Sequence, residues 1–156
     1  MIAQKIKTDQ IILLIILLLA AFLRFYNYAG WSLSNDELSA LSRLQFDSFS
    51  EMIEKGVMLG DFHPAGVQVF LWFWVKVFGN SVVAVRLPFV IFGIVSVYLV
   101  FLIGKRWFSP AAGLFAVSAM AFLQFPILFS QLARPYSPGL LFSLATVLFW
   151  TKIIFD

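Results

Sequence analysis

The chain has 156 residues, of which 62% are hydrophobic and only 12% are charged, with a net charge of +3 and no cysteine. A domain of this length in water could not bury so much apolar surface, so the composition excludes an ordinary soluble fold and indicates an integral membrane protein. The basic residues are scattered, which excludes nucleic acid as a partner, and the absence of cysteine excludes disulfides and thiolate metal sites.

Four apolar segments are predicted to cross the lipid bilayer as helices, in an all-α polytopic fold. They cover about residues 11–28, 88–103, 110–129 and 139–155. Arg24 lies near the end of the first segment, where a long side chain can snorkel to the headgroups. A cleavable signal peptide is the alternative for this segment, but its apolar stretch exceeds the roughly 7–15 residues usual in such signals.

The interval 29–87 is predicted to be a polar loop with short interfacial helices at about 35–46, 49–58 and 65–78. Ser34 and Glu37 have the spacing of a capping box, in which each side chain bonds the backbone N–H of the other residue. The loop also holds six of the eight acidic residues of the chain, namely Asp36, Glu37, Asp47, Glu51, Glu54 and Asp61. This concentration of carboxylates in an apolar chain makes the loop the candidate active site.

Basic residues predict the orientation of the spans, because Lys and Arg stay on the cytoplasmic side. Two lysines near the amino terminus and the pair Lys105-Arg106 mark two cytoplasmic points. An even number of crossings must separate them, so the short segment 65–78 is predicted to lie in the interface. Both termini are then cytoplasmic, and the loops 29–87 and 130–138 share the outer face of a bacterial inner or plasma membrane.

Several motifs follow one another in a definite order along the chain. They are Asp36-Glu37, His63-Pro64, Phe78-Gly79, Arg86-Leu87-Pro88, Lys105-Arg106-Trp107-Phe108 and Ser130-Gln131-Leu132-Ala133-Arg134. In this order and topology the chain resembles the amino-terminal part of the C-type (GT-C) membrane glycosyltransferases, most closely the protein O-mannosyltransferase and aminoarabinose-transferase-like enzymes. Ala65 and Leu132 depart from the His-Pro-Pro and Ser-Gln-Glu-Ala-Arg usual in that family.

The resemblance implies transfer of a sugar from a polyprenyl-phosphate donor to a hydroxyl of a glycan, lipid or protein acceptor on the outer face. Asp36 would be the general base with Glu37 in support, and Arg134 and His63 would bind the donor phosphate. The chemistry agrees, because such a transfer needs a carboxylate to take a proton and a cation beside the leaving phosphate. No cofactor is assigned, and a divalent metal is left open. Family members are several times longer, so the resemblance implies a fragment, truncated product or degenerate copy that is inactive alone.

Each candidate residue also has a purely structural reading. Glu37 suits a capping box, Asp36 is an ordinary acid for the first turn of a helix, His63 is a loop residue, and Arg134 is an interfacial arginine that meets lipid phosphates. For the whole chain, a non-catalytic membrane scaffold or assembly subunit is an alternative function. A transporter segment is another, although the charges avoid the centres of the spans, where ion pathways place them.

Overall fold

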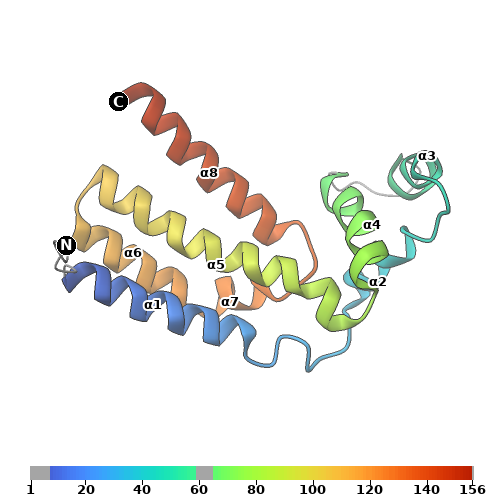
Figure 1. Ribbon diagram of the computed structural model, residues 1–156, viewed down its shortest axis with the longest axis horizontal. Coiled ribbons are helices and arrows are strands. Elements are labelled where there is room, and N and C mark those ends of the chain that lie inside the picture. The colour runs from blue at the N-terminus through green and yellow to red at the C-terminus, as the bar shows by residue number, and fades with distance from the viewer. Residues whose placement is uncertain (1–7, 59–64, 156) are drawn as a thin grey trace, which may run out of the picture.

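The computed structural model describes residues 8–58 and 65–155. All of the regular elements within these ranges are helices, which confirms the predicted all-α class. The bundle consists of α1 (Thr8–Phe25), α5 (Val82–Trp107), α6 (Pro110–Phe122), the short α7 (Gln124–Ser130) and α8 (Tyr136–Phe155) (Figure 1). A second group lies at the amino-terminal end of α5 and contains α2 (Asn35–Ser42), α3 (Phe49–Glu51), the π-helix η1 (Met52–Met58) and α4 (Gly66–Phe78) (Figure 1).

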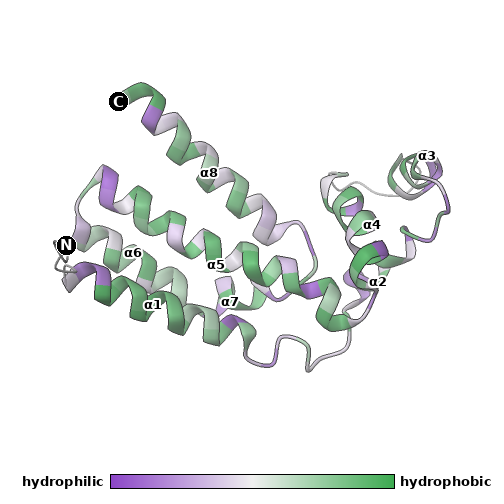
Figure 2. Ribbon diagram, in the orientation of Figure 1, coloured by the Kyte–Doolittle hydropathy of each residue, from purple (hydrophilic) through white to green (hydrophobic). Residues whose placement is uncertain are grey.

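The bundle helices have the length and hydropathy of membrane spans. α1, α5 and α8 each qualify, and the bent pair α6–α7 is a fourth candidate if it is taken as one span. Hydrophobic residues cover most of their length, while hydrophilic residues gather at the helix ends and in the group around α2 (Figure 2). Phe115 and Ile153 are each 79% exposed, as expected where lipid rather than water surrounds the helices. The chain is therefore an integral membrane protein.

The central helix is α5, because it contributes to both hydrophobic cores. The bundle core joins α1, α5 and α6 through Ile16, Ala20, Val97, Phe101, Val117 and Ala121. The second core joins α4, the amino-terminal half of α5 and the turn after α7 through Val67, Leu71, Val85, Phe89 and Ala133. The backbones of α5 and α6 also approach closely, since a Cβ on Gly104 would lie 2.9 Å from the Cα of Gly113. One helix therefore connects the membrane bundle to the candidate site.

The helix α5 begins earlier than the predicted residue 88. Its first turn is capped by the Ser81 hydroxyl, which accepts a hydrogen bond from the Ala84 N–H at 3.2 Å. Pro88 lies within the helix and has no N–H to donate to the Ala84 carbonyl. The Trp74 indole N–H of α4 donates to that carbonyl instead, at 2.8 Å. The proline is thus accommodated, and α4 gains a polar attachment to α5.

The segment 110–129, predicted as one helix, is instead two helices. Leu123 adopts an extended conformation (φ −66°, ψ 136°), and the axes of α6 and α7 differ by 62°. Pro126 then lies in the first turn of α7, where a backbone N–H would have no helical partner and its absence costs little. The bend turns the end of α7 toward the end of α1 (Figure 1).

Arg24 does not snorkel as predicted, because its side chain is fully buried at 0% exposure. Its guanidinium points into the bundle and donates to main-chain carbonyls of α6. The prediction failed because snorkelling assumes that lipid surrounds the residue, whereas here neighbouring protein carbonyls provide the polar environment.

Candidate active site

The candidate site is built around the first turn of α2. The Ser34 hydroxyl accepts a hydrogen bond from the Glu37 N–H at 3.3 Å, and the Glu37 carboxylate accepts one from the Ser34 N–H at 2.9 Å. These two bonds confirm the predicted capping box. They start α2 directly after an irregular loop and fix the Glu37 carboxylate at the first turn of this helix.

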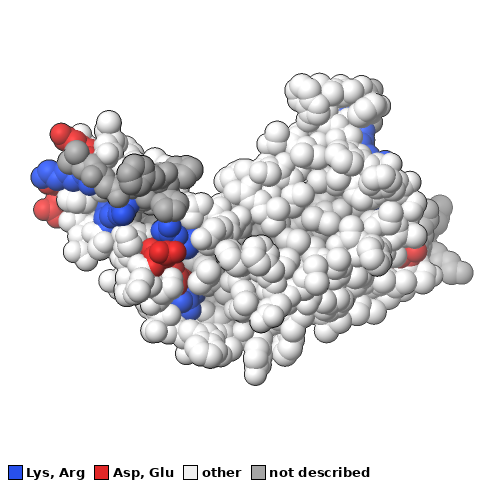
Figure 3. Space-filling view, turned by 180° about the vertical axis from the view of Figure 1, so that it is seen from behind, with Lys and Arg blue, Asp and Glu red and all other residues white. Residues whose placement is uncertain are grey.

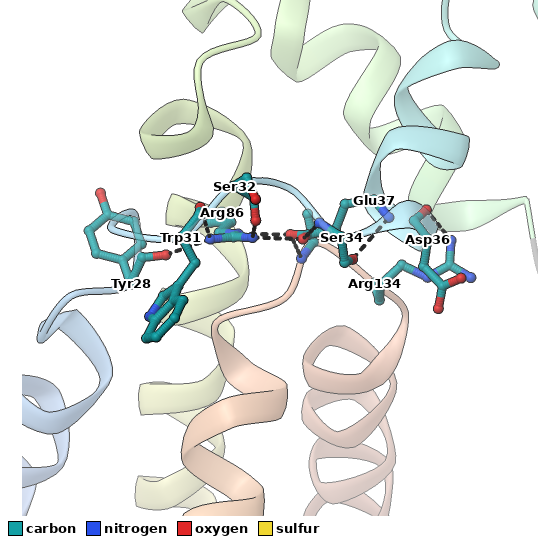
Figure 4. Close-up of polar contacts among 9 residues, drawn as sticks. Tyr28, Trp31, Ser32, Ser34, Asp36, Glu37, Arg86 and Arg134 are labelled. Atoms are coloured by element: carbon teal, nitrogen blue, oxygen red, sulfur yellow. Dashed lines mark hydrogen bonds and ion pairs between the residues drawn. The ribbon is translucent and has the colours of Figure 1, made fainter.

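Glu37 forms a buried ion pair with Arg86 of α5 (Figure 4). The Arg86 Nε lies 2.8 Å from Oε1 of the carboxylate, and Nη2 lies 2.7 Å from Oε2, so the pair is bidentate. The side chains of Arg86 and Glu37 are only 4% and 0% exposed. The Ala133 N–H, from the turn after α7, also donates to Oε1 at 2.9 Å. Each carboxylate oxygen therefore accepts two hydrogen bonds, and a single side chain joins three parts of the chain.

The remaining N–H groups of Arg86 bond the loop between α1 and α2. Nη1 donates to the carbonyls of Tyr28 and Trp31 at 3.0 and 3.1 Å, and Nη2 donates to the Ser32 carbonyl at 3.0 Å (Figure 4). Together with the two bonds to Glu37, these use all five donors of the guanidinium. Arg86 thus determines the path of a loop that has no secondary structure of its own.

The environment of Glu37 keeps it ionised. Burial by itself raises the pKa of the Glu37 carboxyl. Hydrogen bonds from Arg86, Ala133 and Ser34, with the positive charge of Arg86, outweigh this effect and hold the pKa below its usual value. A carboxylate with four donors and a lowered pKa is a poor general base. Its geometry suits an anchor for the site.

Asp36 differs from its neighbour in almost every respect. Its side chain is exposed, and it lies on the Arg134 side of the buried Glu37–Arg86 pair (Figure 4). The Arg134 Nη1 donates to the Asp36 main-chain carbonyl at 3.2 Å, while Arg134 itself is only 6% exposed. A solvent-accessible carboxylate and a guanidinium are therefore held at one edge of the site.

The structure brings three of the four predicted site residues together: Asp36, Glu37 and Arg134. The fourth, His63, lies outside the described residues. Sequence reasoning named Arg86 only as part of a family motif at the end of the loop 29–87 and missed it as part of the site. The available signal was its charge within an otherwise apolar stretch, since charged residues at such positions are rare and usually have a specific partner. In the ranges 8–58 and 65–155, no group of three or more His, Cys, Asp or Glu side chains could hold a metal ion.

An apolar groove begins next to the site. It has a volume of about 440 Å³ and lies between α4, α5 and the start of α8. Pro135, which directly follows Arg134, forms part of its wall. The other lining residues are Gly66, Val67, Phe70, Phe89, Phe92, Pro138, Gly139 and Phe142. The residue that follows Arg134 thus lines a cavity that suits a hydrocarbon chain.

Charge on the molecular surface is concentrated near this site. In the view of Figure 3, acidic and basic side chains gather over the end formed by α2, α3, η1 and α4, and the bundle surface is almost uncharged. Fold and site together define a polytopic membrane protein with one polar site at the end of an apolar helix bundle.

The model of the dolichyl-phosphate-mannose-protein mannosyltransferase family matches residues 62–155, more than half of the chain, and the chain belongs to this family. The family indicates a glycosyltransferase of the mannosyltransferase type. No curated protein and no solved structure matches the chain. The matched range includes Arg86, Ala133 and Arg134 but begins after Asp36 and Glu37. The contacts described above join these two acidic residues to the matched part.

Proposed function

We propose that this chain forms the donor-facing site of a membrane glycosyltransferase. The enzyme transfers a sugar from a polyprenyl-phosphate carrier to an acceptor hydroxyl on the outer face of the membrane. The observation that carries the proposal is the placement of Asp36 and Arg134 at one edge of the site, joined by the 3.2 Å bond from Arg134 to the Asp36 carbonyl. A base and a phosphate-binding cation are the two groups that such a transfer requires.

In the proposed reaction, the Asp36 carboxylate takes the proton of the acceptor hydroxyl while the oxygen of that hydroxyl bonds the anomeric carbon of the sugar. The bond from that carbon to the phosphate oxygen breaks on the opposite side, and the electron pair leaves with the phosphate. The Arg134 guanidinium stabilises the charge that develops on the leaving group, and its planar fork can bind two phosphate oxygens at once. Inversion at the anomeric carbon follows from the direct displacement.

The groove beside Arg134 supports a lipid-linked donor. A polyprenyl phosphate has a charged head and a long hydrocarbon tail, which Arg134 and the apolar groove of about 440 Å³ that begins at Pro135 would respectively bind. The phenylalanine rings of α4, α5 and α8 in the groove wall would contact the isoprene units. Glu37 and Arg86 act indirectly in this proposal, because they fix the loop and the turn that carry the two reacting side chains.

The proposal requires Asp36 to face outward, with four crossings, the outer loop 29–87 and both termini in the cytoplasm. Because the chain has no native cysteine, single cysteines report this directly. Ser34→Cys and Lys105→Cys, both at exposed positions, are expected to react oppositely with an impermeant thiol reagent added to intact cells. Ser34→Cys should label from outside and Lys105→Cys only after permeabilisation. External labelling of Lys105→Cys would contradict the proposed orientation.

Arg134→Lys tests the donor site while keeping the charge. We expect its affinity for a polyprenyl phosphate in detergent micelles to fall at least about tenfold, because a lost hydrogen bond to a charged group is worth roughly 1.5–3 kcal/mol. Quenching of tryptophan fluorescence would measure binding. Arg106→Lys is the matched control and should bind normally, because Arg106 lies in the last turn of α5 and the site lies near the start of that helix. Equal affinity of Arg134→Lys and the unchanged protein would reduce Arg134 to an ordinary contact with headgroups.

A further inference from the structure

A buried arginine at the end of α1 has no role in the proposed chemistry. The Arg24 Nη2 donates to the Met120 carbonyl at 2.9 Å, and Nη1 donates to the carbonyls of Ala121 and Ala20, both at 3.3 Å. Within the described residues, all of these partners are main-chain carbonyls. A charge inside the bundle that is balanced by dipoles alone needs a specific reason, since such charges are expensive within a membrane.

The break between α6 and α7 explains why these carbonyls are available. In a continuous helix the carbonyls of Met120 and Ala121 would accept bonds from residues 124 and 125. The extended conformation of Leu123 ends α6 and leaves these carbonyls without helical donors. They also form the negative end of the α6 dipole, where a cation is favourable. Arg24 therefore supplies both the donors and the charge that the broken helix lacks.

Gln131 makes the converse contact from the end of α7 to the end of α1. Its Nε2 group donates to the carbonyls of Arg24 at 3.0 Å and Tyr26 at 3.2 Å, and it lies 3.5 Å from the Leu23 carbonyl. The Leu23 and Arg24 carbonyls belong to the last turn of α1, which also lacks helical donors, and Tyr26 directly follows that helix. Each helix end is thus capped by a side chain from the other segment.

A glycine on α5 permits this arrangement. A Cβ on Gly93 would lie 2.4 Å from the Cβ of Ser130 and 3.5 Å from the Nε of Arg24. Ser130 is the last residue of α7, so only glycine at position 93 lets α7 end against α5 at this distance. The residues that follow are Gln131 and then Ala133 and Arg134, which contact Glu37 and Asp36.

We propose that Arg24 and Gln131 are positioning residues, which place the turn 131–134 so that Arg134 meets Asp36. The two side chains hold α7 at its 62° bend and attach its end to α1. The bend then sets where the Ala133 N–H and the Arg134 guanidinium lie. The consequence for catalysis rests on the proposed function, whereas the placement of the turn does not.

Arginine is needed at position 24 because of its shape. The guanidinium carries donors in a planar fork and reaches two successive carbonyls of α6 at once, together with one carbonyl of its own helix. A lysine ammonium is a compact point charge on a flexible stem and cannot reproduce this geometry. Arg24→Lys therefore keeps the charge but should no longer hold α7 at its bend relative to α6.

Pairs of spin labels on introduced cysteines, measured in lipid nanodiscs, test the proposal. The local pair joins Leu38 of α2 to Leu128 of α7, and the reference pair joins Leu18 of α1 to Phe149 of α8, all at exposed positions. In Arg24→Lys and in Gln131→Ala, the local pair should lose its single narrow distance while the reference pair keeps it. Gln124→Ala, at the other end of α7, is the matched control and should leave both pairs unchanged.

Two results would overturn the proposal. A local distance that stays narrow in both variants would show that the turn is placed without these side chains. Loss of both distances would show that the residues stabilise the whole bundle rather than the turn. Neither readout depends on sugar transfer, so normal positioning with failed binding of polyprenyl phosphate would refute the proposed function alone. Gly93→Ala provides a second test, because it should displace Ser130 without changing any hydrogen-bonding group. The distribution of distances in the local pair should then broaden.

Discussion

Arg86→Met is expected to be the most destabilising single substitution in the site, lowering the free energy of unfolding by about 3–5 kcal/mol. The variant leaves the Glu37 carboxylate buried at 0% exposure without its counter-charge. It also removes the donors that hold the carbonyls of Tyr28, Trp31 and Ser32. Unfolding by a denaturing detergent, followed by circular dichroism in mixed micelles, would measure the loss.

The chain offers a matched control for this substitution. Lys55 and Glu51 form an ion pair at 2.6 Å, but their side chains are 53% and 37% exposed. Water already solvates both groups, so Lys55→Met should leave the unfolding midpoint unchanged within error. If the variants at positions 86 and 55 behaved alike, the Glu37–Arg86 pair would not be the anchor that its geometry indicates.

The same pair predicts a dependence of stability on pH. The folded state lowers the pKa of Glu37, so its stabilising contribution is present above the pKa of the unfolded chain, about 4.3. That contribution is lost as the pH falls through the lower folded pKa. In Arg86→Met, burial without the arginine should instead favour the protonated carboxyl. The stability difference between the two proteins should therefore shrink as the pH falls below about 4, and a constant difference would contradict the assignment.

Asp36→Asn is expected to reduce sugar transfer by roughly 10²–10⁴-fold, the usual contribution of a positioned general base. The substitution keeps the shape of the side chain but removes its ability to take the acceptor proton. The Asp36 side chain is exposed, and the bond from Arg134 goes to the Asp36 main-chain carbonyl, which the substitution keeps, so folding should be unaffected. Turnover would be measured with the protein as its gene encodes it, using a polyprenyl-phosphate-linked mannose as donor.

Binding of the polyprenyl phosphate should be retained in Asp36→Asn, which separates a defect in chemistry from a defect in the donor site. Asp47→Asn, at another exposed acid of the interval 29–87, is the matched control and should transfer at the normal rate. An active Asp36→Asn protein would remove the general-base assignment. A variant that neither binds donor nor folds would assign Asp36 a structural role instead.

The sequence by itself determined that lipid surrounds the long helices, that the fold is all-α and where α2 starts. Long apolar segments require helices in lipid, because backbone groups there must be bonded within the segment. The capping box at Ser34 and Glu37 spans only three residues, so its geometry is local and readable from spacing. The order of the motifs was also sufficient to indicate the family that the match over residues 62–155 shows.

Only the tertiary structure decided which polar groups meet. Glu37 and Arg86 are 49 residues apart, and Arg24 and Met120 are 96 residues apart, so no local pattern relates the members of either pair. The spacing of Glu37 indicated a cap but not the four donors around its carboxylate, because three of them come from α5 and the turn after α7. The break at Leu123 was likewise hidden, since an apolar stretch reads the same whether its helix is straight or bent. Arg24 satisfies the carbonyls exposed at that break, and this long-range contact determines where the turn bearing Arg134 lies.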